Sequence, residues 1–348
     1  MGGPALVGSD TLSFRVEEGW EQLPSTYSHG DVAGIAVDSE DRVYVFNRSE
    51  HPVMVYRRDG TFVSSWGEGV FNTPHGITID SEDVVFCTDH SDHTVRRFTR
   101  EGDLIQVLGA PGVASDSGVV GLDYRTIQRG APPFNGPTNL AVAPSGDLFV
   151  SDGYGNARIH RFSSDGVLKA SWGEPGSGPG QFNVPHSVAV DSTGRVLVAD
   201  RENNRVQIFS PDGQFIDEWK DLARPCDFTI DWAGNIFVAE LGPAGPFSYT
   251  PPFAPDYPPS RVSVFDADGN VIARWGTKAD PCAPGSFYAA HGVCVDSNGD
   301  LYVGEVSRTG SLDEFDRPIR AHAILDSLPS GCHTLQKFVR VTETQTES

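Results

Sequence analysis

The sequence predicts an all-β protein with the fold of a six-bladed β-propeller, because it shows a six-fold repeat with hairpin turns and blade-length spacing. Similar segments start at residues 33, 75, 138, 186, 226 and 291. Each contains short, alternating apolar runs separated by Asp-Gly and related turns, which is typical of antiparallel hairpins. The intervals of 40 to 65 residues agree with four-stranded blades, the longer ones containing insertions.

The tryptophans support this count and indicate how the ring closes. Four of them end the fourth run of a repeat: Trp66, Trp172, Trp219 and Trp275. Trp20 precedes the first repeat, whereas the last repeat stops at its third run, around residues 335–341. Residues 12–20 are therefore predicted to supply the fourth strand of the last blade. An N-terminal strand would then close the ring and leave only short, protected edges.

The predicted domain is a single propeller of residues 12–341, between an N-terminal tail of residues 1–11 and a C-terminal tail of residues 342–348. Three stretches exceed the repeat and are read as insertions: residues 110–136, 241–260 and 306–332. Gly- and Pro-rich loops of this length usually form functional walls or lids. We expect them to surround one mouth of the central channel.

Composition limits the partners. With 26 basic and 47 acidic residues, the formal net charge is −21, which argues against nucleic acid or an anionic membrane as the main partner. No apolar stretch approaches the roughly 18 residues of a membrane-spanning helix. The start, MGGPALVGSD, lacks the basic and apolar regions of a signal peptide. We therefore expect a soluble, cytoplasmic protein, and the sequence leaves its oligomeric state open.

The five cysteines are odd in number and form no CxxC pair. A full disulfide framework is therefore not expected, and a reducing compartment is the default. Cys87 and Cys294 fall within apolar runs and are interpreted as small buried hydrophobes. Cys226 takes the position that histidine occupies in other repeats. It either lines the channel near a metal or packs in the core.

The first run of every second repeat has a histidine at one matched position: His75, His186 and His291. The other repeats have Ala33, Thr138 and Cys226 there. Fourteen residues further on, each repeat has a polar marker residue: Asn47, Asp89, Asp152, Asp200, Glu240 and Glu305. Histidines on alternate blades at one height would aim three imidazoles at the axis. Three imidazoles with an open fourth position are the usual catalytic zinc arrangement, although imidazole also suits iron, copper and nickel.

His90 and His93, in TDHSDHTV, have a spacing that could suggest a second metal site. They lie past the end of a predicted strand, in a turn. We expect both side chains to be solvated.

Three further polar residues lie just beyond the marker: Arg48, Tyr154 and Arg201. Two guanidinium groups and a phenol around a Lewis acid suit a small anionic substrate, because arginine binds carboxylate in bidentate fashion. A tyrosine near a metal ion and arginine has its pKa lowered, which makes phenolate a candidate base. Alternatively, Arg201 and Arg48 pair on the surface with neighbouring acids such as Glu202 and Glu50.

These residues lie in phrases that resemble a known family. VPHSVAVD, VLVADRENNRVQIF, VSDGYGNARI, TPHGITID and FNRSEH are similar to the catalytic core of peptidyl-α-hydroxyglycine α-amidating lyase, the lyase half of the peptide-amidating enzyme. The resemblance extends over residues 30–340 and implies a six-bladed propeller of NHL type. It implies zinc ligands at His75, His186 and His291, a catalytic Tyr154, and two active-site arginines, Arg48 and Arg201.

The resemblance also implies a structural calcium ion, held by the backbone carbonyls of Ile35 and Ile77 and by an aspartate after the third zinc ligand. Gly292 follows His291 in this chain, so the calcium site is not matched. Half-cystines of the family are replaced as well, by Gly155 and Leu197.

The implied reaction cleaves a small anionic substrate, R–CO–NH–CH(OH)–COO⁻, to an amide and glyoxylate. Zinc would bind the substrate hydroxyl, Arg48 or Arg201 the carboxylate, and Tyr154 would take the hydroxyl proton. Three alternatives stay open: a ureidoglycolate-like substrate, a different metal-dependent reaction such as lactone hydrolysis, and a non-catalytic NHL interaction platform.

Overall fold

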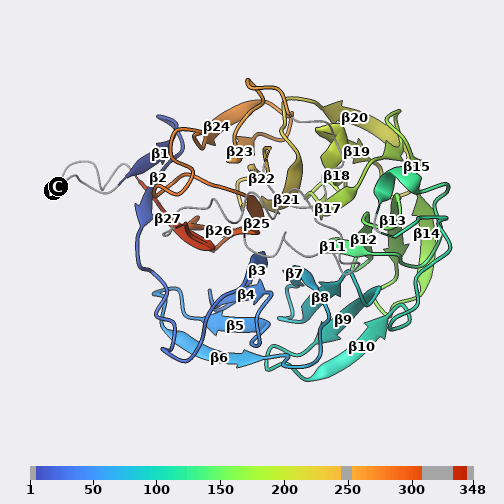
Figure 1. Cartoon of the computed structure of the whole chain (residues 1–348), viewed down its shortest axis with the longest axis horizontal. Coiled ribbons are helices and arrows are strands. Elements are labelled where there is room, and N and C mark those ends of the chain that lie inside the picture. The colour runs from blue at the N-terminus through green and yellow to red at the C-terminus, as the bar shows by residue number, and fades with distance from the viewer. Residues whose placement is uncertain (1–4, 122, 244–252, 308–331, 343–348) are drawn as a thin grey trace.

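The computed structural model describes residues 5–121, 123–243, 253–307 and 332–342. These residues form six antiparallel sheets arranged as blades around a central axis, with the first strand of each blade innermost (Figure 1). The six-bladed β-propeller predicted from the sequence is confirmed.

The blades follow one another in chain order. Blade 1 contains β3 (Val32–Val37), β4 (Val43–Asn47), β5 (Val53–Tyr56) and β6 (Phe62–Trp66). Blade 2 contains β7 (Pro74–Ile79), β8 (Val85–Asp89), β9 (Thr94–Phe98) and β10 (Leu104–Leu108). Blade 3 contains β11 (Pro137–Val142), β12 (Leu148–Asp152), β13 (Arg158–Phe162) and β14 (Leu168–Trp172).

Blade 4 contains β17 (Pro185–Val190), β18 (Val196–Asp200), β19 (Arg205–Phe209) and β20 (Phe215–Trp219). Blade 5 contains β21 (Pro225–Ile230), β22 (Ile236–Glu240), β23 (Arg261–Phe265) and β24 (Val271–Trp275). Between blades 3 and 4 lies a short parallel pair, β15 (Glu174–Pro175) and β16 (Gln181–Phe182). Two 3₁₀ turns, η1 (Tyr124–Thr126) and η2 (Arg201–Asn203), complete the elements outside blade 6.

Blade 6 joins the two ends of the chain. It contains β25 (Ala290–Val295), β26 (Leu301–Glu305) and β27 (Leu335–Arg340), and β2 (Ser13–Glu17) runs antiparallel to β27 as the fourth strand. The predicted closure by an N-terminal strand is therefore confirmed. β1 (Leu6–Gly8) pairs with β2 as a fifth strand, so part of the segment expected to be a tail is ordered into the sheet.

The apolar core lies between neighbouring blades, and a tryptophan at the end of the outer strand in blades 1, 3, 4 and 5 helps to seal it. Trp66 of blade 1 packs on Phe98 of blade 2, with ring centroids 5.1 Å apart. Trp20, at the end of the closing strand, packs in the same way on Tyr56 of blade 1, at 5.5 Å. Burial of such large rings stabilises each blade against the next.

The polar marker residue that ends the second strand has one structural role in all six blades. Its side-chain oxygen accepts a backbone N–H of the segment that enters the same blade: Asn47 from Gly30, Asp89 from Asn72 and Thr73, Asp152 from Asn135, Asp200 from Asn183, Glu240 from Ala223, and Glu305 from Tyr288 and Ala289. Buried backbone donors need such partners. The marker therefore fixes where each inner strand begins.

Cys282 and Cys332 form a disulfide, fifty residues apart in the sequence. Cys87, Cys226 and Cys294 are free, so a full framework is absent among the described residues. The reducing, cytoplasmic location expected from the sequence stays a prediction.

Among the described residues, no helix has the length and apolar character needed to cross a bilayer. Of the three insertions, residues 110–136 are described except for residue 122. Most of the insertion at 306–332, part of that at 241–260 and the C-terminal tail from residue 343 lie outside the described residues.

Candidate metal centre and its polar surroundings

The three register histidines meet on the propeller axis. The ring centroids of His75, His186 and His291 lie 4.7, 4.9 and 4.8 Å from one another in pairs, and the side chains are 2%, 1% and 3% exposed. One nitrogen from each ring lies within 4.8 Å of the others. The convergence predicted from their register is therefore present, and the group could hold a metal ion.

A β-bulge aims these side chains at the axis. In every blade the pairing between the first two strands shifts at the histidine register, and the residues skipped include Ala33, His75, Thr138, His186, Cys226 and His291. A bulged residue leaves the hydrogen-bond ladder and its side chain is redirected. Its backbone carbonyl is also free to accept a bond from outside the blade.

The odd blades use that free carbonyl. His75 Nδ1 donates to Thr138 O at 2.6 Å, His186 Nδ1 to Cys226 O at 2.8 Å, and His291 Nδ1 to Ala33 O at 2.7 Å. Each histidine is thus oriented by the register residue of the next blade. This bond fixes the proton on Nδ1 and leaves the Nε2 lone pair for a metal ion.

Burial lowers the pKa of His75 and His186 well below the ordinary range and lowers the pKa of His291 to about 3. The nearby guanidinium groups of Arg48 and Arg201 add to this effect. The three imidazoles are therefore neutral at physiological pH, which is the form that binds metal. The donor set fits a transition-metal ion.

Tyr154 lies directly against this group. Its hydroxyl oxygen is 3.0 Å from His75 Nε2 and 2.9 Å from His186 Nε2, and Arg201 Nη1 donates to it at 3.4 Å. Burial raises the pKa of Tyr154, whereas Arg201 and Arg48 oppose the shift. Desolvation therefore exceeds the effect of the two cations, and the lowering of the Tyr154 pKa expected beside a metal ion stays a prediction.

Arg201 is held by a buried ion cluster. Its Nε donates to Glu202 Oε1 at 2.8 Å, and Arg224 Nη2 donates to the same oxygen at 2.8 Å. The predicted alternative of an ion pair with Glu202 is correct as to the partner, but the pair is buried. Nη2 of Arg201 is buried without a hydrogen-bond partner among the described residues. A donor left in that state suits an anion.

Arg48 reaches the site from blade 1. Its Nε donates to Pro74 O, next to His75, at 3.1 Å, and its Nη1 lies 3.9 Å from Asp31 Oδ2. Within the described part of the chain Arg48 thus contacts Pro74 and Asp31, and the predicted pair with Glu50 is not among its contacts. The predicted polar residues Arg48, Tyr154 and Arg201 therefore surround the histidine group.

His90 belongs to the site, and the prediction that it is solvated is wrong. Its side chain is 4% exposed, and its ring centroid lies 6.0 Å from that of His75 and 4.9 Å from that of Tyr154. Burial lowers the pKa of His90 to about 3. His93 is not free either, because its Nδ1 accepts the N–H of Gly136 at 3.1 Å. The signal was present in the sequence, since His90 directly follows its marker residue as Arg48 and Arg201 follow theirs.

Blades 5 and 6 present apolar residues at the same register. Leu241 and Val306 directly follow their markers and are 1% and 2% exposed, in one cluster with Ala33, Cys226 and Ala289. The Cys226 side chain thus packs in an apolar wall, and only its carbonyl contacts a candidate ligand. The site has a polar side on blades 1 to 4 and an apolar side on blades 5 and 6.

The calcium site implied by the resemblance does not fit. Ile35 and Ile77 line an axial cavity of about 300 Å³ together with Asp227. A Cβ atom at Gly292 would lie 2.9 Å from Gly34 Cα, so no aspartate can stand there without displacing blade 1. The carboxylate of Asp227 is already engaged, by Asn139 Nδ2 at 2.7 Å, Ser187 Oγ at 2.9 Å and Val293 N at 3.1 Å. These oxygens bind protein donors from three blades.

The chain is a six-bladed β-propeller that contains NHL repeats. The NHL repeat pattern matches residues 134–162 and 182–209. The chain is 37% identical to human (Homo sapiens) NHL repeat-containing protein 3 over 226 residues, 61% of each protein. It is 31% identical to the Mus musculus peptidyl-glycine alpha-amidating monooxygenase over 339 residues, 87% of this chain and 32% of the relative.

A shorter match of 77 residues, 21% of this chain and 22% of the relative, is 47% identical to a probable peptidyl-alpha-hydroxyglycine alpha-amidating lyase of Caenorhabditis elegans. The chain thus spans less than two thirds of the length of these relatives. A gluconolactonase from Xanthomonas campestris has the same fold, with a TM-score of 0.58 and 14% identity over 98% of this chain and 96% of the other. Amidating enzymes are therefore among the homologues of this propeller.

Proposed function

We propose that this chain is a zinc-dependent carbon–nitrogen lyase that cleaves an N-acyl-α-hydroxyglycine to an amide and glyoxylate. The observation that carries the proposal is the position of Tyr154. Its hydroxyl lies within 3.0 Å of two candidate ligand nitrogens and 3.4 Å from Arg201 Nη1. A base, a Lewis-acid site and a carboxylate-binding cation thus lie within one hydrogen-bond length of one another. The similarity to amidating enzymes supports the same chemistry.

The protein groups divide the reaction between them. A zinc ion held by the three imidazoles would supply a Lewis acid that polarises the substrate hydroxyl. The unpartnered Nη2 of Arg201, with Arg48, binds the carboxylate. Tyr154, in the phenolate form that a bound zinc ion would favour, takes the hydroxyl proton and passes it to the departing nitrogen, while the C–O bond becomes the aldehyde C=O and the C–N bond breaks. The amide nitrogen leaves with a proton, so R–CO–NH₂ and glyoxylate form without consumption of water.

The apolar side of the site favours an apolar acyl group. With the carboxylate at Arg201, the acyl group of the substrate extends toward Leu241, Val306 and Ala289, which offer no hydrogen-bonding side chain. A polar ureido group would lose its hydration there without compensation, at a cost of about 1–3 kcal/mol per unpaired group. An N-acyl substrate is therefore preferred over ureidoglycolate.

The test is a glyoxylate-release assay on α-hydroxyhippurate and ureidoglycolate, with zinc content determined by elemental analysis. We expect release from α-hydroxyhippurate that scales with zinc up to about one ion per chain, as three ligands and one open position require. A preference for ureidoglycolate would contradict the proposal that the apolar side of the site binds the acyl group. Stoichiometric metal without release from either compound would refute the lyase proposal but keep the metal site. Absence of both would favour an interaction platform.

A further inference from the structure

The turn that carries Tyr154 is held from outside by the insertion that precedes blade 3. Tyr154 N donates to Gly136 O at 3.3 Å, and Gly155 N donates to Asn135 O at 2.7 Å. At the carbonyl of the same residue, Ser117 Oγ donates to Gly155 O at 2.5 Å. Both polar groups of Gly155 are thus bound by the insertion.

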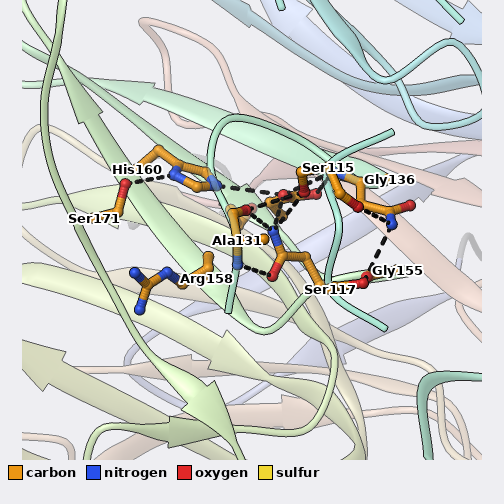
Figure 2. A network of polar contacts seen from close by, with 12 residues as sticks. Ser115, Ser117, Ala131, Gly136, Gly155, Arg158, His160 and Ser171 are labelled. Atoms are coloured by element: carbon orange, nitrogen blue, oxygen red, sulfur yellow. Dashed lines mark hydrogen bonds and ion pairs between the residues drawn. The ribbon is translucent and has the colours of Figure 1, made fainter. Parts of the chain in front are cut away.

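These contacts belong to one buried network, seen in Figure 2, which extends from His160 and Ser171 at one end to Ser117 and Gly155 at the other. Its centre is the carboxylate of Asp152, which accepts Asn135 N at 3.0 and 2.9 Å. Further contacts join the two ends: Asn156 Nδ2 to Asp152 Oδ2 at 2.7 Å, His160 Nε2 to Asp152 Oδ2 at 3.3 Å, His160 Nδ1 to Ser171 Oγ at 2.7 Å, and Asn135 Nδ2 to Ser115 O at 2.9 Å and to Ser117 Oγ at 3.3 Å.

The turn that carries Tyr154 is closely packed against the insertion, with no space for a side chain at Gly155 or Gly136. A Cβ atom at Gly155 would lie 2.2 Å from Asn135 Oδ1, and one at Gly136 would lie 2.9 Å from Tyr154 Cβ. The phenol ring itself packs in an apolar cluster with Tyr124, Ile127 and Val184. Tyr124 and Ile127 come from the same insertion. The insertion therefore contacts the turn on its backbone and the tyrosine on its ring.

We propose that Ser117 and Asn135 are positioning residues, and that the insertion acts as a clamp that holds the Tyr154 hydroxyl at the two ligand nitrogens. The proposal rests on the proposed lyase function. Neither residue contacts the histidines in any described bond, so both act through the backbone of Gly155. Displacement of a catalytic group by about 1 Å can cost on the order of 100-fold in rate. A single hydroxyl in this network is therefore expected to matter for turnover more than for folding.

Two serine variants separate positioning from stability. Ser117→Ala removes the hydroxyl that holds Gly155 O, and Ser171→Ala removes the hydroxyl at the far end of the same network, next to His160. Ser117 Oγ makes three hydrogen bonds and Ser171 Oγ makes one, so both variants should lower the melting temperature by a few degrees, Ser117→Ala by more. Zinc content should be unchanged in both, because the Nδ1 bonds of the histidines are not touched.

We expect Ser117→Ala to lower kcat for α-hydroxyhippurate by about 10- to 100-fold with little change in KM, and Ser171→Ala to change kcat by less than about twofold. Ser117→Thr, which keeps the hydroxyl, should recover part of the loss. Equal kcat losses in Ser117→Ala and Ser171→Ala, or an unchanged kcat in Ser117→Ala, would overturn the clamp.

A second readout does not depend on the lyase activity. Amide hydrogen exchange of the turn at residues 153–157 should be faster in Ser117→Ala than in the wild-type protein and unchanged in Ser171→Ala. If the wild-type protein releases no glyoxylate, the lyase proposal fails while the exchange result still decides whether the insertion holds the turn. Unchanged exchange in Ser117→Ala would refute the clamp whatever the activity.

Discussion

The even and odd blades of this propeller share one backbone design but contribute different atoms to the centre. Blades 2, 4 and 6 place an imidazole at the bulge of the inner strand, whereas blades 1, 3 and 5 place a carbonyl oxygen there. Each imidazole donates to the carbonyl of the following odd blade. A six-fold repeat is thereby converted into a three-fold set of candidate ligands with three matching acceptors.

The comparison shows why the side chains of the odd blades can vary. Ala33, Thr138 and Cys226 have nothing in common as side chains, but any residue supplies the same carbonyl. On the odd blades only the backbone conformation at this position is constrained. On the even blades the residue itself must be histidine. Substitutions at the two kinds of position should differ accordingly.

The largest effect is expected for His186→Ala on blade 4. Removal of a group that only hydrogen-bonds a metal ligand lowers metal affinity by about 10- to 100-fold. Removal of one of the three proposed ligands should lower zinc affinity by more than that. Activity should be lost together with the metal. The ring should stay folded, since its core lies between the blades. Elemental analysis, glyoxylate release and circular dichroism check this, with His51→Ala, a partly exposed histidine away from the site, as control. Retained zinc would mean that two histidines suffice.

Tyr154→Phe should keep the metal and lose most of the turnover. A positioned general base contributes about 10²- to 10⁴-fold, so kcat should fall within that range. The phenol oxygen contacts His75 and His186 only through hydrogen bonds, so zinc content should stay at the wild-type value. Tyr44→Phe, in the core of blade 1, serves as the control. A rate close to wild type would show that another group takes the proton.

Much of this arrangement could be predicted from the sequence, because it follows from periodicity. The blade count, the closing strand and the histidine register all repeat at readable intervals. The prediction that His90 is solvated failed because a single histidine in a turn is not part of a repeating histidine pattern. Its register after Asp89 becomes informative only once Arg48 and Arg201 are known to point inward.

Other features could not be predicted because they depend on packing across blades. The marker residues were visible, and in every blade each binds a backbone donor 17 residues earlier in the chain, but the sequence does not show that the two groups meet. Burial of Arg201 with Glu202 and Arg224 depends on how blades 4 and 5 meet. The disulfide between Cys282 and Cys332 joins segments whose proximity follows from ring closure and not from a cysteine motif.

Arg201→Lys should weaken substrate binding with a smaller effect on the metal. Arginine bonds Glu202 and Tyr154 at once and keeps Nη2 free, whereas an ammonium group has no such planar fork. We expect kcat/KM to fall by about 10- to 100-fold, mainly through KM. Arg195→Lys, in a surface turn, is the matched control. A loss confined to kcat would assign Arg201 to proton transfer instead.

Asp227→Asn, on odd blade 5, tests the axial network that replaces the implied calcium site. Burial raises the pKa of Asp227 from 3.8 to about 7 in the folded protein. The stability that this carboxyl group contributes is therefore fully present below about pH 3.8 and is lost as pH rises through about 7. The wild-type free energy of unfolding, relative to that of the variant, should fall by about 1.4 kcal/mol per pH unit between pH 4 and 7.

Urea unfolding of both proteins at several pH values, in the presence of a chelator, measures this difference. Addition of calcium in place of the chelator should leave it unchanged, because the carboxylate is engaged by protein donors. A difference that does not vary with pH would show that the carboxyl group has an ordinary pKa, and a calcium-dependent difference would restore the metal site.

The smallest effect is expected for Cys226→Ala. This variant is the sharpest test of whether the odd blades contribute only backbone atoms to the centre. The carbonyl that orients His186 stays in the variant, and the Cys226 side chain packs in the apolar cluster with Ala33 and Leu241. Zinc content and kcat should change by less than about twofold, and stability should fall by about 1 kcal/mol for the small cavity left behind. Loss of zinc together with activity would show that a sulfur atom completes the ligand set. In that event the odd blades would contribute side chains as well as backbone, and their sequence would be constrained at blade 5 as strongly as the histidines are at blades 2, 4 and 6.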